Sequence, residues 1–166
     1  MAKIAATEEQ VLTVEACPEV AYAFFSRPEE LSRAMDSVER CESLPGGNVR
    51  WVLGEKVDQG IRFRPDYIVA YDGDGAGHIR WRTVEGNMGN DGDVWITPLP
   101  DGRSEIHYRE SVEPDLPITP LMARLIKPLV ARELRREIVH FLDRVRDHLS
   151  NSNTPASPDA IREEIR

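Results

Sequence analysis

Cysteine is scarce in this 166-residue chain, which has only Cys17 and Cys41. Two cysteines are too few for a disulfide framework, and neither belongs to a Cys-x-x-Cys motif or a Cys/His pair of the kind that binds zinc. The four histidines also share no His-x-His or i, i+4 spacing. We therefore expect a cytoplasmic protein with no metal site and no cofactor.

Long apolar runs and excess positive charge are also missing. No run of about 18 apolar residues occurs, and the N-terminus reaches Glu8 and Glu9 before it can build the apolar core of a signal peptide. The chain has 21 Lys and Arg against 29 Asp and Glu, which gives a net charge of -8. Because nucleic acids are bound through clustered Lys and Arg, we expect no membrane span, no standard export signal and no nucleic-acid partner.

Familiar catalytic motifs are absent as well. The chain contains neither Gly-x-Ser-x-Gly nor Gly-x-x-x-x-Gly-Lys-Ser/Thr, so it lacks the usual hydrolase and phosphate-binding loops. Residues 72–77 begin like a calcium loop, but Ala76 occupies a ligand position and Thr83 stands where the bidentate glutamate belongs. We predict a hairpin turn there. The lack of a catalytic pattern favours binding over catalysis.

What the chain does contain is a long amphipathic segment near its C-terminal end. From Val130 to Leu149, apolar residues recur at steps of three and four, while arginines and aspartates fill the opposite face. This spacing predicts a long helix with one apolar face. Pro120 suits a first helical turn, but Pro128 lacks an amide hydrogen and predicts a kink or break near Lys127.

The length and the 40% hydrophobic content fit one domain with a sizeable core. After Leu149 the sequence Ser-Asn-Ser-Asn-Thr-Pro-Ala-Ser-Pro offers nothing to bury. We therefore predict a single domain over residues 1–149 and a flexible tail over residues 150–166.

Strand patterns precede the helix. A strand from Glu9 to Ala16 leads into two short helices that begin at Pro18 and Pro28. Turn-forming residues then separate further strands, at 45–48, 58–60, 72–77, 87–92 and 100–102. The clearest alternation predicts that the longest strand has on one face Ile61, Phe63, Pro65, Tyr67, Val69 and Tyr71. These patterns predict an α+β fold in which the helix covers the dry face of an antiparallel sheet.

Several segments resemble one superfamily. Residues 14–31 read Val-Glu-Ala-Cys-Pro-Glu-Val-Ala-Tyr-Ala-Phe-Phe-Ser-Arg-Pro-Glu-Glu-Leu, which is similar to the opening of START-like proteins, also called SRPBCC proteins, of the polyketide cyclase/dehydrase and coenzyme Q-binding type. Residues 79–86 and 92–106 resemble later strands of the same group. Arg27 stands where the pattern usually has Asp, and Ser104 where Thr is commoner. The resemblance extends over residues 10–149.

This resemblance implies a helix-grip fold, in which a curved antiparallel sheet of about six or seven strands surrounds the long C-terminal helix and two short helices close one end. Members hold hydrophobic small molecules, and some catalyse cyclisation or dehydration. We accordingly expect a lipid-, quinone- or polyketide-like ligand in a cavity between sheet and helix, held without turnover. The alternatives are a polyketide cyclase/dehydrase-type enzyme and a protein- or ribosome-interaction module.

Candidate ligand-binding residues follow from their chemistry. Aromatic rings with a polar edge suit an apolar ligand that carries a hydroxyl or carbonyl group, and methionine adapts to different shapes. The predicted ligand-binding residues are Trp51, Phe63, Tyr67, Trp81, Met88, Trp95, Tyr108, Met122, Ile126, Leu134 and Ile138. If the protein is an enzyme, alternate side chains of one strand supply the acid/base candidates His107, Tyr108 and Glu110.

The last helix also carries a basic stripe between Arg124 and Arg146 on an otherwise acidic protein. Such a stripe is a candidate contact for anionic lipid headgroups or for a protein partner. We expect any such peripheral contact to involve Arg132, Arg135 and Arg136.

Overall fold

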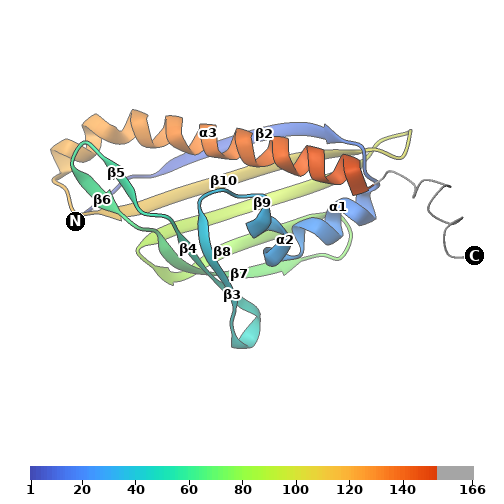
Figure 1. Ribbon diagram of the computed structural model, residues 1–166, viewed down its shortest axis with the longest axis horizontal. Coiled ribbons are helices and arrows are strands. Elements are labelled where there is room, and N and C mark those ends of the chain that lie inside the picture. The colour runs from blue at the N-terminus through green and yellow to red at the C-terminus, as the bar shows by residue number, and fades with distance from the viewer. Residues whose placement is uncertain (153–166) are drawn as a thin grey trace, which may run out of the picture.

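A curved antiparallel sheet crossed by one long helix makes up most of the computed structural model, which describes residues 1–152 (Figure 1). The main sheet consists of β1 (Ala2–Lys3), β2 (Ala6–Val14), β3 (Val38–Ser43), β4 (Asn48–Leu53), β7 (Asp66–Gly73), β8 (His78–Gly86), β9 (Met88–Pro98) and β10 (Ser104–Leu116). Their order is β1-β10-β9-β8-β7-β4-β3, and β2 also pairs with β10. The sheet is therefore an antiparallel meander whose first strands return to pair with its last strand.

Three helices and a small hairpin complete the fold of residues 1–152. Helices α1 (Pro18–Phe25) and α2 (Pro28–Arg33) follow β2 and lie toward the end of the sheet where α3 (Pro120–Ser152) finishes (Figure 1). Strands β5 (Lys56–Asp58) and β6 (Ile61–Phe63) pair only with each other, and a short 3-10 turn, η1, spans Pro45–Gly47. The predicted α+β helix-grip fold is confirmed, with eight strands in the main sheet where about six or seven were expected.

A kink or a break was predicted near Lys127; helix α3 is continuous through Pro128, so the break does not occur. Proline at this position removes the hydrogen bond that an amide would donate to the carbonyl of Arg124. Both Arg124 and Pro128 are exposed, so water can bond to that carbonyl. The helix therefore loses one hydrogen bond without burying an unpaired group.

The helix also extends past the predicted domain boundary, because residues 150–152 belong to α3. Residues 153–166, the rest of the predicted tail, lie outside the described residues. The division into a folded domain and a tail stays a prediction, with its boundary moved to the end of α3.

The stretch predicted as the longest strand is divided between β6 and β7, and the longest strand is β10. Pro65 separates the two because it has no amide to donate to a strand partner. Its carbonyl still accepts a hydrogen bond from the amide of Leu53, at 3.0 Å.

The predicted turn over residues 87–92 is also shorter than expected. Only Asn87 lies between β8 and β9, and its side chain fastens the corner to the start of β7. Asn87 Nδ2 donates to the carbonyl of Arg64 at 2.8 Å, and its Oδ1 accepts from the amide of Asp66 at 2.9 Å. Gly92 therefore lies inside β9.

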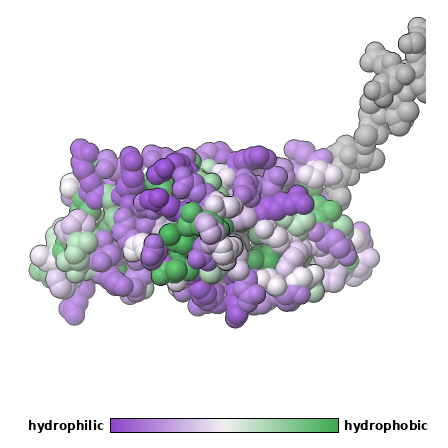
Figure 2. All heavy atoms as spheres, turned by 90° about the horizontal axis from the view of Figure 1, so that it is seen from below, coloured by the Kyte–Doolittle hydropathy of each residue, from purple (hydrophilic) through white to green (hydrophobic). Residues whose placement is uncertain are grey.

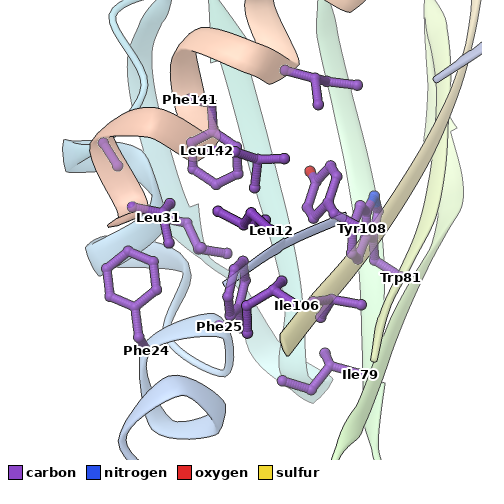
Figure 3. Close-up of a cluster of buried hydrophobic side chains, with 14 of the residues drawn as sticks. Leu12, Phe24, Phe25, Leu31, Ile79, Trp81, Ile106, Tyr108, Phe141 and Leu142 are labelled. Atoms are coloured by element: carbon purple, nitrogen blue, oxygen red, sulfur yellow. The ribbon is translucent and has the colours of Figure 1, made fainter. Parts of the chain in front are cut away.

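The core lies between the concave face of the sheet and the last five turns of α3. The helix buries one stripe of residues, as its periodicity predicted: Leu134, Ile138, Phe141, Leu142, Val145 and Leu149. Figure 3 shows Phe24 and Phe25 of α1 and Leu31 of α2 beside this part of the helix. The sheet, α1, α2 and the second half of α3 thus fill one end of the molecule.

The turn between β7 and β8 is held by Asp74. Its Oδ1 accepts hydrogen bonds from the amides of Ala76, Gly77 and His78, at 2.8 to 3.0 Å. The bond from His78 and those from the other two amides lower the pKa of Asp74 to about 2 from an ordinary 3.8. The segment that begins like a calcium loop is therefore a carboxylate-capped hairpin, as predicted.

The hydrogen bonds to Asp74 predict how its carboxyl group titrates. Because the pKa of Asp74 is lowered by folding, its stabilising effect is present above the ordinary value and is lost as the pH falls through about 2. We expect an NMR titration of the Asp74 carboxyl to show the lowered value, and Asp74→Asn to lack that acid-dependent loss of stability. A titration at the ordinary value would contradict these hydrogen bonds.

Candidate functional site

A cavity of about 1260 Å³ lies between the sheet, α3 and the β5–β6 hairpin. It forms because α1 and α2 fill only one end of the space under α3, and the buried stripe of the helix begins at Leu134. The inward side chains of β4, β7, β8, β9 and β10 form one wall, and they are mostly aliphatic or aromatic. An apolar cavity with a few polar groups is typical of small-molecule binding sites, and this one is large enough to hold a small-molecule ligand.

The cavity reaches the surface between the hairpin and the helix. Val57 of β5 and Val139 of α3 both line it and are 58% and 38% exposed. Figure 2 shows hydrophobic residues reaching the surface in the middle of the face seen from below, with hydrophilic residues around them. A hydrophobic ligand could enter here without crossing the sheet.

Ion pairs tie the elements at this opening to α3. Lys56 of β5 pairs with Glu137 and lies 3.7 Å from Glu133. Asp36, after α2, pairs with Arg144 and lies 3.3 Å from His140. These partly exposed pairs hold the hairpin and the α2–β3 connection against the helix.

Most of the predicted ligand-binding side chains line this cavity: Trp51, Phe63, Tyr67, Trp81, Met88, Tyr108, Ile126, Leu134 and Ile138. Two do not. Trp95 lies on the opposite face of the sheet, between His78 and His107, with ring centroids 5.1 and 4.9 Å away. Met122 is exposed on α3, outside the cavity.

The three acid/base candidates are divided by the pleat of β10. Tyr108 and Glu110 line the cavity, whereas His107 lies on the outer face, where it contacts Glu9. Successive side chains of a strand point to opposite faces, so His107 cannot share a site with Tyr108.

Besides its tryptophans, the strand wall has five polar side chains: Tyr67, Tyr71, Asn90, Tyr108 and Glu110. All of them except Tyr71 form one hydrogen-bonded cluster with Trp81. Asn90 Nδ2 donates to Glu110 Oε1 at 2.8 Å and to Tyr67 Oη at 3.1 Å. Asn90 Oδ1 accepts from Trp81 Nε1 at 2.8 Å, and Tyr108 Oη donates to Glu110 Oε2 at 2.8 Å. The carboxylate is thus held at a fixed place in an otherwise apolar wall.

Burial changes the acidity of this cluster. It raises the pKa of Glu110, and the charge of Glu137 adds to the effect, while the hydrogen bonds from Tyr108 and Asn90 oppose it. Burial, with the nearby charge of Glu110, also raises the pKa values of Tyr67 and Tyr108 well above their ordinary value. Both tyrosines are therefore neutral hydrogen-bonding groups near neutral pH.

The sequence does not indicate Asn90, which connects the cluster, because residues 87–92 have the composition of a turn. The predicted ligand-binding residues also leave out Tyr71 and Val69, although both belong to the alternating stretch whose inward face lines the cavity. That alternation was the available signal for Tyr71 and Val69. Asn90 has no such signal, since its partners come from three other strands.

The arginines predicted for peripheral contacts are exposed on α3, and all three also line the cavity where it opens to solvent. Arg136 pairs with Glu133 at 2.6 Å, and Arg135 lies 3.9 Å from Glu8. These carboxylates offset part of the basic stripe, and a contact through Arg132, Arg135 and Arg136 stays a prediction. Within residues 1–152, no three His, Cys, Asp or Glu side chains gather where they could hold a metal ion, and no helix is long and apolar enough to cross a membrane.

Comparison with known proteins agrees with this architecture. Residues 2–150 match the family model described as "Polyketide cyclase / dehydrase and lipid transport". Curated proteins gave no significant match.

Solved structures share the fold at low sequence identity. A START superfamily protein from Mycobacterium smegmatis is 15% identical, with a TM-score of 0.69 over 89% of this chain and 99% of that one. The Zhui aromatase/cyclase from Streptomyces sp. R1128 is 18% identical, with a TM-score of 0.65 over 93% and 98%. A Thermus thermophilus protein is 18% identical, with a TM-score of 0.67 over 90% and 99%. These likenesses show the fold alone.

Proposed function

We propose that this chain, which belongs to the polyketide cyclase/dehydrase and lipid transport family, binds a hydrophobic small molecule such as a lipid, quinone or polyketide in the cavity under α3 and releases it unchanged. The observation that carries the proposal is the large apolar cavity with a hydrogen-bonded polar cluster on its strand wall. Burial of apolar ligand surface supplies the affinity, and the cluster orients one polar group of the ligand.

The chemistry of the lining favours carriage over turnover. Both oxygens of Glu110 already accept hydrogen bonds, and the neighbouring tyrosines are held neutral. Cys41 lies outside the cavity, and burial raises the pKa of its thiol to about 11, so it is a poor nucleophile. The Tyr108 hydroxyl donates to Glu110, but burial raises its pKa well above the ordinary value, so it too is a poor nucleophile.

A cyclase-type enzyme is the second candidate, and Glu110 is the observation in its favour. A carboxyl whose pKa is raised by burial, next to a neutral tyrosine, can exchange protons with a bound carbonyl compound. If an aldol-type cyclisation of a polyketide analogue is detected, Glu110→Gln should abolish it. An activity that survives this change would leave the carrier proposal as the better account.

Native mass spectrometry of the purified protein, followed by solvent extraction, tests the proposal directly. We expect a bound mass above that of the 18.8 kDa chain and a discrete extracted compound. Added ligand should also change tryptophan emission, because Trp51 and Trp81 line the cavity.

A matched pair of substitutions locates the bound molecule. Val112→Phe adds a ring inside the cavity, and Val84→Phe adds the same ring at a side chain that is 53% exposed and outside it. We expect the first variant to lose most of the bound compound and the second to keep it. Equal retention by two folded variants would place the ligand elsewhere, and absence of any ligand with no response to lipids, quinones and aromatics would refute the binding function.

A further inference from the structure

We propose that the cavity selects ligands with an uncharged hydroxyl group, an alcohol or a phenol, which docks between Glu110 and Tyr67, and that it rejects carboxylate ligands. This inference rests on the proposed binding function and specifies its ligand class. It depends on which groups of the polar cluster donate, which accept, and which charges surround them.

The orientation of Asn90 sets the cluster. Trp81 Nε1 can only donate, so the atom of Asn90 that it meets at 2.8 Å must be the carbonyl oxygen. The amide nitrogen therefore faces Tyr67 and Glu110, and each of its two hydrogens has one acceptor. With Asn90 fully engaged, it has no donor left for a ligand.

Tyr67 and Glu110 retain complementary capacity. Among the described residues, the Tyr67 hydroxyl makes one hydrogen bond, in which it accepts from Asn90, so its own proton is free. Each oxygen of Glu110 accepts one hydrogen bond and can accept another. Because both groups bond to one amide nitrogen, they lie next to each other. One ligand hydroxyl can therefore satisfy both groups, because its proton can be donated to Glu110 and its oxygen can accept the proton of Tyr67.

The surrounding charges disfavour an anion. None of the cavity-lining residues from β7, β8, β9 and β10 is a Lys, Arg or His. The basic lining residues are on β5 and α3: Lys56, Arg132, Arg135, Arg136 and His140. Lys56 is paired with Glu137, and Glu137 is the charge that faces the cluster from α3. A buried carboxylate ligand would therefore meet Glu110 without a compensating cation, which is costly in a low-dielectric site.

Titration gives this selectivity a pH dependence. The ionisable groups that face Glu110 are Tyr108 on its own strand, Tyr67 and Tyr71 on β7, and Glu137 on α3. Burial raises the pKa values of all three tyrosines, so they stay neutral. As the pH falls through the raised pKa of Glu110, the carboxylate loses its charge and gains a proton to donate. Rejection of a carboxylate ligand should therefore weaken in acid.

Three probes built on the same pyrene ring test the proposal by isothermal titration calorimetry with the full chain: hydroxypyrene, methoxypyrene and pyrene carboxylate. Methoxypyrene can accept from Tyr67 but has no proton for Glu110. At about pH 8 we expect hydroxypyrene to bind about tenfold tighter than either of the others, the ratio that a hydrogen bond to a charged group supplies. Pyrene carboxylate should bind more tightly as the pH is lowered toward about 5.

Glu110→Gln keeps the shape of the side chain and removes its charge. We expect this variant to bind pyrene carboxylate about tenfold better than the original chain does at about pH 8, and to lose the pH dependence. Tyr67→Phe removes the free donor and should weaken hydroxypyrene and methoxypyrene alike. Glu105→Gln, on the exposed outer face of β10, is the matched control and should change nothing.

The outcomes separate the two proposals. If the original chain binds all three probes equally, or if Glu110→Gln leaves the ratios unchanged, the selectivity is refuted while the binding function stands. If the pH dependence of pyrene carboxylate binding disappears in Glu137→Gln and persists in Glu110→Gln, Glu110 is not the docking group and the proposal fails. If no probe binds and no ligand copurifies, the binding function itself fails.

Discussion

Replacing Phe141 with alanine should lower the free energy of unfolding by about 3–5 kcal/mol, the usual cost of truncating a buried aromatic residue. Phe141 is 5% exposed on α3, and its ring centroid lies 5.7 Å from that of Tyr108 on the sheet. Phe141 belongs to the cluster of buried side chains at the packed end of the core (Figure 3). It also lines the cavity. The void left by the ring would join an existing space, so little repacking can compensate for the lost contacts.

Urea unfolding followed by circular dichroism measures this effect. Val139→Ala on the same helix is the matched control, because that side chain is 38% exposed and a surface truncation should stay within about 0.5 kcal/mol. The helical content of the two folded variants should be equal. If Phe141→Ala lowers the free energy of unfolding no more than Val139→Ala does, the packing of α3 on the sheet does not depend on this stripe.

The period of a helix is visible in the sequence, which is why the buried stripe from Leu134 to Leu149 falls within the apolar face predicted from Val130 to Leu149. What hydrophobic spacing cannot show is whether the lost hydrogen bond at Pro128 lies in water or in the core. The start of the helix is exposed, so the bond is lost at little cost and the helix continues.

The faces of the strands were harder to predict, although part of the signal was present. Trp95 was expected in the cavity because it is large and aromatic. Its neighbours Val94 and Ile96 are both buried on the inner face, and the period of two then places Trp95 outside. For Trp95, the alternation along the strand indicates the correct face, whereas aromatic character does not.

The polar cluster could not be predicted, because it depends on strand register. Asn90 meets Trp81, Tyr67 and Glu110, which come from β8, β7 and β10. No local sequence pattern indicates which residues of four different strands lie next to each other in the folded sheet. Glu110 was a candidate from its position on one strand, but the partners that hold it came only with the structure.

Gly92 gives the second large prediction, since the structure assigns it a role that differs from the turn expected of it. It lies inside β9, opposite Trp81 of β8, and a Cβ atom at this position would lie 2.0 Å from Cζ2 of that indole. The absent side chain is what allows the ring of Trp81 to lie across the strand and reach Asn90 Oδ1. We expect Gly92→Ala to displace the indole and to cost about 2–4 kcal/mol of unfolding free energy, from overpacking and from the loss of a buried hydrogen bond. Tryptophan emission should shift to the red, and binding of hydroxypyrene should weaken with it.

A double-mutant cycle shows whether this cost passes through Trp81. If the clash with the indole is the cause, Gly92→Ala should cost less than about 1 kcal/mol in a Trp81→Ala background, because the ring that it strikes is gone. Gly54→Ala is the glycine control, since a Cβ there makes only ordinary contacts of 3.7 and 3.8 Å. An equal cost of Gly92→Ala in both backgrounds would mean that the strand backbone, and not the indole, requires glycine. The observed closeness of Gly92 to Trp81 argues for the first result, because no other described atom lies nearer to the added Cβ than those of the indole ring.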